Sequence, residues 1–426
     1  MTETTPEDRV DLTETPGRPK VLVVGDAVAP TGFARVLQCV LERLRGRYEF
    51  HQMGINYWGD PHDLAWKIYP AGLHGDGRGL NRLAGLVEKL RPDLIFIMAD
   101  LWQLMQYAGI LARLPNRIPA IAYFPVESDP VEPKAMVHLL QGIDHLVTYT
   151  GFGAKEVERA VLQARTTHPE LPARPLSVIG HGVDQRVFFP LAGSRPEQLA
   201  EGRLAARTLL FDRRPDLRDA FIVLNANRNQ PRKRIDVTIE AFALFSADKP
   251  DTVKLYLHMA RQDVGWDIQR LAERFNVLDR LIVTRNDDEH NEVCNSRLNH
   301  IYNACDVGVN TSSSEGWGLV SFEHGATGAA QIVPRHTSLT GLWEDAAELV
   351  EPSYSVISEQ ILTRAYFTSP RDVAQAMQHL YEDPARRQRL SEAAIRLTSQ
   401  PRMNWDNIAG QWDQVFSAHL RPTPAT

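Results

Sequence analysis

The sequence predicts an α/β protein built from two domains, each formed around a parallel β-sheet. Short apolar runs, the pattern of strands buried on both faces, alternate with stretches of helical length, and this order of elements is typical of parallel sheets. The chain also has 426 residues, more than one hydrophobic core usually supports. We therefore expect two such domains.

The composition is that of an ordinary globular protein. Apolar residues make up 43% of the chain, charged residues 23%, and the formal net charge is −6, which gives no overall footprint for nucleic acid. We expect no transmembrane segment and no signal peptide, because neither pattern occurs in the sequence. The three cysteines Cys39, Cys294 and Cys305 lack metal-ligand spacing, which fits a cytoplasmic protein.

The first domain is expected over residues 19–190, after a disordered lead-in at 1–18 that is polar and contains two prolines. Strands are predicted at 20–25, 94–97, 120–123 and 145–148. The helical patterns between them lie at 33–45, 80–90 and 101–114.

The same order of elements restarts in the second domain, over residues 216–403, after a polar, Arg-rich linker at 191–215. Its predicted strands are 220–224, 254–257, 281–283 and 307–309, and its predicted helices are 236–245, 268–275 and 319–327. A last helix is predicted at 404–420.

Two glutamates flank a turn between the predicted strand at 307–309 and the helix that follows. Seven residues separate Glu315 from Glu323, and Gly316 and Gly318 stand among them. A strand-to-helix junction directs free N–H groups and the positive end of a helix dipole into one crevice, where a diphosphate can bind. Carboxylates accept hydrogen bonds from sugar hydroxyls. The spacing suits a nucleotide sugar; a solvated loop residue and an ordinary helix carboxylate are the alternative.

The segment from Glu315 to Glu323 resembles the E-x7-E motif of retaining glycosyltransferases of family 4. These enzymes have the GT-B fold, in which two Rossmann-like domains with parallel sheets face each other across a cleft. The resemblance implies that Glu315 contacts the donor sugar and that Glu323 binds the nucleotide ribose. It also implies that the backbone of Trp317, Gly318 and Leu319 holds the diphosphate.

A basic loop follows the first predicted strand of the second domain. Cations at the carboxyl end of a buried strand suit a diphosphate, whereas a solvated loop is the alternative. The loop resembles the family's G-R-L-x-x-x-K-G-x-D segment, which implies that Arg228 and Lys233 stabilise the leaving group. Arg232 could supply the guanidinium instead, and Arg234 stands where the family has glycine. With Glu315 as the third catalytic residue, this chemistry needs no metal.

Gly32 and four further residues of the first domain are expected on the donor and acceptor side. Gly32 stands where the family's glycine loop closes over the donor phosphates, although a plain helix N-terminal turn is an alternative. The family's histidine that faces the sugar is missing from the stretch 122–130. Glu127 and Asp129 stand there, as sugar or acceptor ligands or as solvated carboxylates. Tyr57 and Trp58 either stack on a sugar or base or fill space in the fold as a structural plug.

The resemblance extends from Lys20 to about Trp412 and implies a metal-independent, retaining glycosyltransferase without a bound cofactor. The donor would be a UDP-, GDP- or ADP-sugar carrying a hexose. The base of the nucleotide stays undetermined, because His258-Met259-Ala260 departs from the family's glycine-rich turn. We expect a small-molecule or glycan acceptor. DNA is an alternative, because the loop at 56–62 resembles phage-type chains, some of whose relatives modify DNA bases.

Alternatives for the function and for the last helix stay open at this point. A sugar-nucleotide epimerase of the same fold and a non-catalytic nucleotide-sugar sensor would share the two-domain cleft. The helix at 404–420 would cross back to brace the first domain, as it does in the family, or it would pack on its own domain. The acidic loop at 287–289 is read as a solvated turn rather than a metal site.

Overall fold

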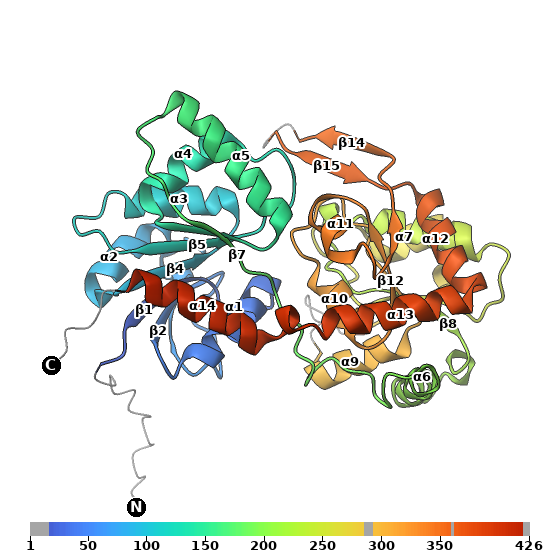
Figure 1. Ribbon diagram of the computed structural model, residues 1–426. Coiled ribbons are helices and arrows are strands. Elements are labelled where there is room, and N and C mark those ends of the chain that lie inside the picture. Colours follow the sequence, from blue (N-terminus) through green and yellow to red (C-terminus); the bar gives the residue numbers. More distant parts are fainter. Residues whose placement is uncertain (1–16, 285–292, 359–361, 421–426) are drawn as a thin grey trace, which may run out of the picture.

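The computed structural model describes residues 17–284, 293–358 and 362–420 and contains two α/β domains that lie side by side (Figure 1). The disordered lead-in predicted at 1–18 falls on residues that, apart from Gly17 and Arg18, lie outside these ranges, and so does the acidic loop at 287–289. None of the described helices combines the length and apolar character that crossing a membrane requires.

The first domain is built on a parallel sheet of seven described strands in the order β3-β2-β1-β4-β5-β6-β7. The strands are β1 (Lys20–Asp26), β2 (Glu49–Ile55), β3 (Lys67–Pro70), β4 (Leu94–Met98), β5 (Ala120–Phe124), β6 (His145–Thr148) and β7 (Leu176–Val178). The helices are α1 (Gly32–Leu44), α2 (Leu80–Leu90), α3 (Leu101–Leu111), α4 (Pro133–Gly142) and α5 (Gly151–Thr167). The third helix ends three residues earlier than predicted, because Pro115 disfavours helical backbone before it.

The central strand β1 is buried on both faces, as its apolar run predicts. Val21 and Val23 belong to a hydrophobic cluster with α1, whereas Leu22 and Val24 belong to a second cluster with α2, α3 and α4. Because successive side chains of a strand point to opposite faces, this run needs a helical layer on each side of the sheet.

The second domain repeats this architecture with six described parallel strands in the order β10-β9-β8-β11-β12-β13. The strands are β8 (Phe221–Asn225), β9 (Val253–Leu257), β10 (Leu281–Val283), β11 (Val307–Val309), β12 (Ala330–Pro334) and β13 (Glu348–Val350). The helices are α6 (Pro196–Leu210), α7 (Ile235–Ser246), α8 (Ile268–Arg274), α9 (Asn295–Ala304), α10 (Leu319–Ala326), α11 (Thr337–Trp343), α12 (Pro370–Glu382) and α13 (Pro384–Thr398). An antiparallel hairpin of β14 (Tyr354–Ile357) and β15 (Arg364–Phe367) projects from the domain (Figure 1).

The segment predicted as a linker, 191–215, contains the helix α6. This helix is fixed to the second domain by buried charge pairing: Nη2 of Arg207 donates to Asp306 over 2.7 Å, and Arg203 lies 3.2 Å from the same carboxylate. Asp306 precedes β11 and also accepts from the amide of Ile222. Arg203 and Arg207, which belong to the Arg-rich stretch that suggested a linker, therefore anchor a helix.

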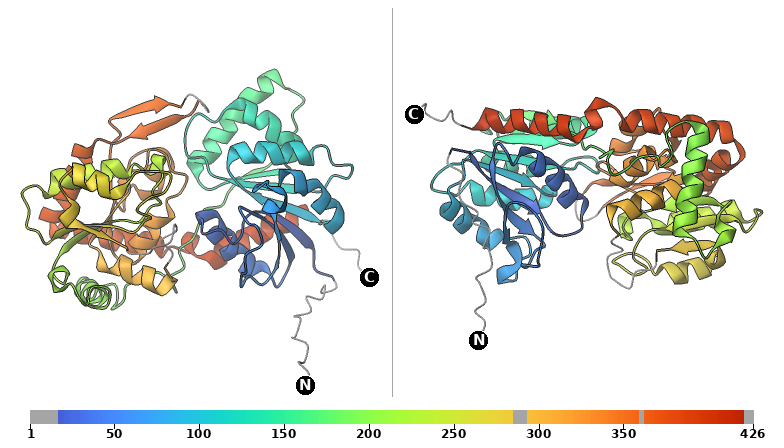
Figure 2. Two further views of the ribbon diagram at one scale, coloured as in Figure 1. Left: turned by 180° about the vertical axis from the view of Figure 1, so that it is seen from behind. Right: turned by 90° about the horizontal axis from the view of Figure 1, so that it is seen from below.

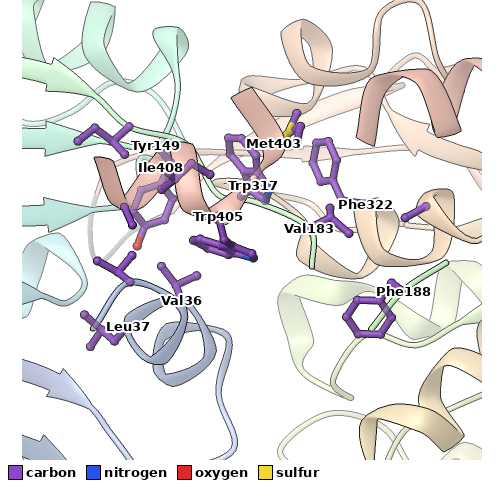
Figure 3. Close-up of a cluster of buried hydrophobic side chains, with 14 of the residues drawn as sticks. Val36, Leu37, Tyr149, Val183, Phe188, Trp317, Phe322, Met403, Trp405 and Ile408 are labelled. Carbon is purple, nitrogen blue, oxygen red and sulfur yellow. The ribbon is translucent and has the colours of Figure 1, made fainter. Parts of the chain in front are cut away.

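The last helix, α14 (Trp405–His419), crosses back to the first domain and packs on α1 and the sheet (Figures 1 and 2). Trp412 is fully buried, with its ring centroid 4.7 Å from those of Phe96 and Tyr123. Near the domain boundary, Trp405 lies between α1 and the Trp317 side chain (Figure 3). One hydrophobic cluster thus runs through both domains and fixes their relative position.

Candidate functional site

The candidate site lies at the carboxyl ends of both sheets, where the strand order reverses. This reversal occurs between β1 and β4 in the first sheet and between β8 and β11 in the second. Loops diverge at such points and leave a crevice in which ligands bind. A cavity of about 560 Å³ opens there, and both domains line it, with Gly32, Arg35, Arg228, Tyr302, Leu319 and Glu323 among its residues.

The turn between β11 and α10 depends on its two glycines. Gly318 has a φ of 86°, in the left-handed region where a side chain costs about 1–2 kcal/mol. At Gly316, a Cβ would lie 2.8 Å from Cβ of Pro125 in the first domain. One glycine therefore bends the chain into α10, and the other lets the first domain approach the turn.

The side chain of Trp317 points away from the turn into the interdomain cluster (Figure 3). It is 7% exposed, and its ring packs on those of His181 and Phe322. This packing fixes the turn from behind and leaves the backbone of Trp317 to meet a ligand, the role that the resemblance implies and that stays a prediction.

Lys233 and Arg232 meet Glu315 in a buried cluster. Lys233 ends the 3-10 turn Pro231–Lys233, and its ammonium donates a hydrogen bond to Oε2 of Glu315. Nη1 of Arg232 lies 3.7 Å from the same oxygen, and the Ser312 hydroxyl donates to it over 3.1 Å. Lys233 is 8% exposed and Glu315 5%. The structure thus brings the basic loop and the first glutamate of the motif together.

The electrostatics of this cluster favour an ionised Glu315. Burial raises the pKa of Glu315, but Lys233 and Arg232 outweigh burial and hold it at about 2. The pKa of Lys233 is lowered, because burial and repulsion by Arg232 together outweigh the attraction of Glu315. The lowered pKa of Glu315 and the lowered pKa of Lys233 are consistent, because the single carboxylate of Glu315 is shared by two cations. An ammonium carries three N–H donors, so Lys233 can also bind a second anion.

Arg228 lies apart from this cluster. Its Nε donates to Oδ2 of Asp263 over 2.7 Å, and its side chain is 51% exposed. It borders the cavity on the side of Glu323, whereas Arg232 borders Glu315. Of the two arginines left open by the sequence, Arg232 is the one that contacts the Glu315 carboxylate.

Glu323, the second glutamate of the motif, is held between the two domains. Its Oε1 accepts from Arg35 of α1, and its Oε2 accepts from the Tyr302 hydroxyl of α9 over 3.2 Å. Sequence reasoning missed both partners. Arg35 stands three residues after Gly32 on the same helix, so the T-G-F-A-R motif at the start of α1 could have identified it as a site residue. No sequence motif marks Tyr302.

Gly32 and Leu319 bring the N-termini of two helices together. A Cβ on Gly32 would lie 3.3 Å from Cδ1 of Leu319, and Thr31 caps α1 by accepting from the amide of Ala34 over 3.1 Å. Helices α1 and α10 therefore begin at adjacent points of the cavity wall. Their amide ends add positive potential to the site.

The two carboxylates of the stretch 122–130 have different surroundings. Oε1 of Glu127 lies 3.3 Å from Nη2 of Arg232, so this side chain faces the cation cluster from the first domain. Burial raises the pKa of Glu127, an effect that Arg232 opposes and Glu315 strengthens. Asp129 instead accepts from the Tyr366 hydroxyl over 2.7 Å, and its carbonyl accepts from the Arg364 amide. Asp129 thus joins the β14–β15 hairpin to the first domain.

Tyr57 and Trp58, predicted together on the acceptor side, are separated by the fold. Tyr57 is 5% exposed and donates its hydroxyl hydrogen to the carbonyl of Asp60 over 2.6 Å, which corresponds to the structural plug. Trp58 is 56% exposed.

Arg234 occupies the position of the family's glycine with a φ of 49°. Its guanidinium pairs with Asp236 and lies 4.8 Å from the ring centroid of Phe367. These contacts offset the cost of the left-handed backbone. In the described ranges, no cluster of three or more His, Cys, Asp or Glu side chains is arranged to hold a metal ion.

Residues 242–414 match a family model described as glycosyl transferase-like. A D-inositol 3-phosphate glycosyltransferase from Thermomonospora curvata is 26% identical over 316 residues, which covers 70% of this chain and 64% of that relative. The chain thus spans less than two thirds of the length of this curated relative.

Two solved structures show the same arrangement of domains. The sucrose-phosphate synthase from Thermosynechococcus elongatus superposes with a TM-score of 0.67 at 18% identity, covering 94% of this chain and 98% of that one. A complex of Anabaena HepE with UDP and glucose superposes with a TM-score of 0.64 at 18% identity, covering 94% and 100%. The fold is GT-B, as predicted: two Rossmann-like domains with parallel sheets.

Proposed function

We propose that this protein is a glycosyltransferase that moves a sugar from a nucleoside diphosphate sugar to a hydroxyl group of an acceptor, with retention at the anomeric carbon. The observation that carries the proposal is the meeting of Lys233 and Arg232 with Glu315 beside the glycine turn of α10. Cations, helix-end amides and a hydroxyl-binding carboxylate are the groups that a sugar diphosphate needs.

The proposed reaction breaks the bond between the anomeric carbon and the diphosphate oxygen, and the electron pair leaves with the diphosphate. Lys233, Arg232 and the amides that open α10 would stabilise the charge that develops there. The acceptor hydroxyl would attack from the face that the diphosphate leaves, and its proton would pass to the departing phosphate oxygen. These steps balance without a metal ion, so turnover should persist in EDTA.

The cavity would hold the nucleotide half of the donor. Its volume of about 560 Å³ is within the usual range for ligand sites. Glu323 would bind the ribose hydroxyls, since each carboxylate oxygen can accept more than the one bond it receives from Arg35 or Tyr302. Arg228 would reach the phosphates from the cavity side. Glu315, at the far end of the motif, would hold the hydroxyls of the transferred sugar.

The comparisons support a UDP-sugar as the first donor to test. The curated relative is named a glycosyltransferase of D-inositol 3-phosphate, and the HepE structure contains UDP and glucose. A thermal-shift screen against UDP-, GDP- and ADP-sugars would identify the donor, because a ligand that binds the folded state raises the unfolding temperature.

Release of nucleoside diphosphate and the anomeric configuration of the product, followed by NMR, test the proposal. We expect nucleotide release together with an α-linked product from an α-linked donor. An isomerised nucleotide sugar without transfer would favour the epimerase, and binding without turnover would favour the sensor. Either result would contradict the proposed function.

A further inference from the structure

Two exposed tryptophans follow the carboxyl ends of β2 and β4, strands of the parallel sheet of the first domain. Trp58 is 56% exposed and Trp102, on the first turn of α3, is 43% exposed. A Cβ on Gly72 would lie 2.4–2.6 Å from three atoms of the Trp58 five-membered ring, so this glycine faces the ring plane. The indole therefore lies against the Gly72 backbone, although the residue is 56% exposed.

The two tryptophans are linked by one short segment. A Cβ on Gly77 would lie 3.3 Å from the Trp58 ring. The next residue, Arg78, places its guanidinium 4.3 Å from the ring centroid of Trp102. We call Trp58, Arg78 and Trp102 the aromatic rim.

Carboxylates that follow the strands of the first domain connect the aromatic rim with the cluster of Lys233, Arg232 and Glu315, because Glu127 lies 3.3 Å from Arg232. The amide of Asn56 donates to the carbonyl of Gly77 over 2.7 Å, and Nδ2 of Asn56 donates to Asp26, the last residue of β1, over 3.2 Å. Trp102 lies two residues after Asp100, the N-terminal capping residue of α3. Because β1, β4 and β5 are neighbouring parallel strands, Asp26, Asp100 and Glu127 share one edge of the sheet.

This edge is acidic. Asp76 precedes Gly77, so four carboxylates border the rim and its edge, at Asp26, Asp76, Asp100 and Glu127. Two guanidinium groups lie nearby: that of Arg78 lies over the Trp102 ring, and that of Arg232 pairs with Glu127, while Lys233 and Glu315 neutralise each other. A phosphate group would be repelled by this excess of carboxylates, whereas hydroxyl groups can donate hydrogen bonds to carboxylate oxygens such as those of Glu127.

We infer that the aromatic rim binds the acceptor and that this acceptor is an uncharged carbohydrate, whose sugar rings stack on Trp58 and Trp102 while a hydroxyl points to Asp100 and Glu127. Amphipathic sugar rings suit such a surface, because an indole face contacts their C–H groups and the carboxylates bind their hydroxyls. The inference rests on the proposed function and narrows its acceptor. It separates this chain from relatives that are named for phosphorylated substrates.

Matched pairs of acceptors test the charge argument. Myo-inositol and inositol 3-phosphate, glucose and glucose 6-phosphate, and fructose and fructose 6-phosphate are offered with the donor found by thermal shift, together with maltotriose and a DNA hexanucleotide. We expect neutral sugars to be glycosylated with at least about tenfold higher kcat/KM than their phosphate esters. The double variant Asp100→Asn/Glu127→Gln should narrow this ratio, since it removes two charges that repel phosphate.

Substitutions of the two tryptophans test the stacking surface. Trp58→Ala and Trp102→Ala should each raise the KM for the neutral acceptor about 5- to 10-fold, the size expected for one lost aromatic contact, and should raise the donor KM much less. Leu162→Ala removes an apolar side chain on α5 that is 67% exposed and serves as the control with unchanged KM values. Thermal unfolding checks that all three variants fold.

The inference would be overturned by higher kcat/KM for the phosphate esters, by transfer to the hexanucleotide alone, or by an acceptor KM unaffected by both tryptophan substitutions. Donor hydrolysis without transfer to any neutral sugar would also overturn it, while leaving the proposed function in place. Absence of both hydrolysis and transfer would instead contradict the proposed function. The two failures are therefore distinguishable.

Discussion

Replacing Lys233 by methionine should separate the structural role of its ion pair from its proposed catalytic role. Methionine keeps a long apolar stem but removes the charge. The pKa of Glu315 is about 2, against 4.5 for an ordinary glutamate, and this difference corresponds to about 3 kcal/mol in favour of the charged form. Arg232 and Ser312 still contact Glu315 in the variant. The loss of stability should therefore not exceed about 3 kcal/mol, the low end for breaking a buried pair.

Turnover should fall much further than stability. If Lys233 stabilises the departing diphosphate, its removal should lower kcat by about 10²-fold or more, as the loss of one preorganised donor does. The double variant Lys233→Met/Glu315→Gln removes both charges, so no buried carboxylate is left without its partner. Its stability should return to within about 1 kcal/mol of the original chain, while its turnover stays low.

Urea unfolding and release of nucleoside diphosphate at saturating donor measure the two effects. Lys254→Met is the matched control, because Lys254 is also buried in the second domain, 7% exposed, and bonds the carbonyl of Asp279. It should lower stability and leave kcat unchanged. Near-normal turnover in Lys233→Met, or turnover that recovers together with stability in the double variant, would exclude the proposed catalytic role of Lys233.

Three further predictions follow from the same contacts. Because the folded pKa of Glu315 is lowered, its stabilisation is present above pH 4.5 and is lost as pH falls toward 2; urea midpoints between pH 7 and 3 should show this loss, and Glu315→Gln should remove that part of the slope. Gly316→Ala would place a Cβ 2.8 Å from Pro125, so it should push the domains apart and raise the donor KM; an unchanged KM together with an unchanged radius of gyration in X-ray scattering would contradict this. Trp412→Ala should cost about 3–5 kcal/mol in urea unfolding, because this side chain is fully buried between α14 and the first domain; a smaller loss would mean that α14 contributes little to the brace.

The fold could be predicted because the elements around each sheet centre carry strong local patterns. The strand over Val307–Val309 and the helix over Leu80–Leu90 have the bounds that the sequence predicts. The predicted strands omit β3 and the β14–β15 hairpin, which are only partly buried or exposed, so their sequences need not be apolar. They also omit the buried strands β2 and β12. The helix α6 was missed because its arginines point to an ion pair within the fold rather than to solvent.

The candidate site was predictable where one loop holds the pattern and not where two domains meet. Glu315, Glu323 and Lys233 lie in recognisable segments, and the structure places Lys233 against Glu315. The contacts of Arg35 with Glu323 and of Arg232 with Glu127 join residues that are far apart in the chain. No spacing within a sequence reports such pairs, because they depend on how the two domains dock. The burial of Tyr57 and the exposure of Trp58 likewise depend on tertiary packing, because Tyr57 packs against Gly54 of β2 and Trp58 lies against Gly72.

The most direct test of the central claim is a crystal structure with the nucleoside diphosphate that gives the largest thermal shift. We expect its terminal phosphate to lie between the side chains of Lys233 and Arg232 and the backbone amides of residues 317–319, with the ribose at Glu323. Phosphates that lie away from both Lys233 and the glycine turn would contradict the proposed roles of these residues.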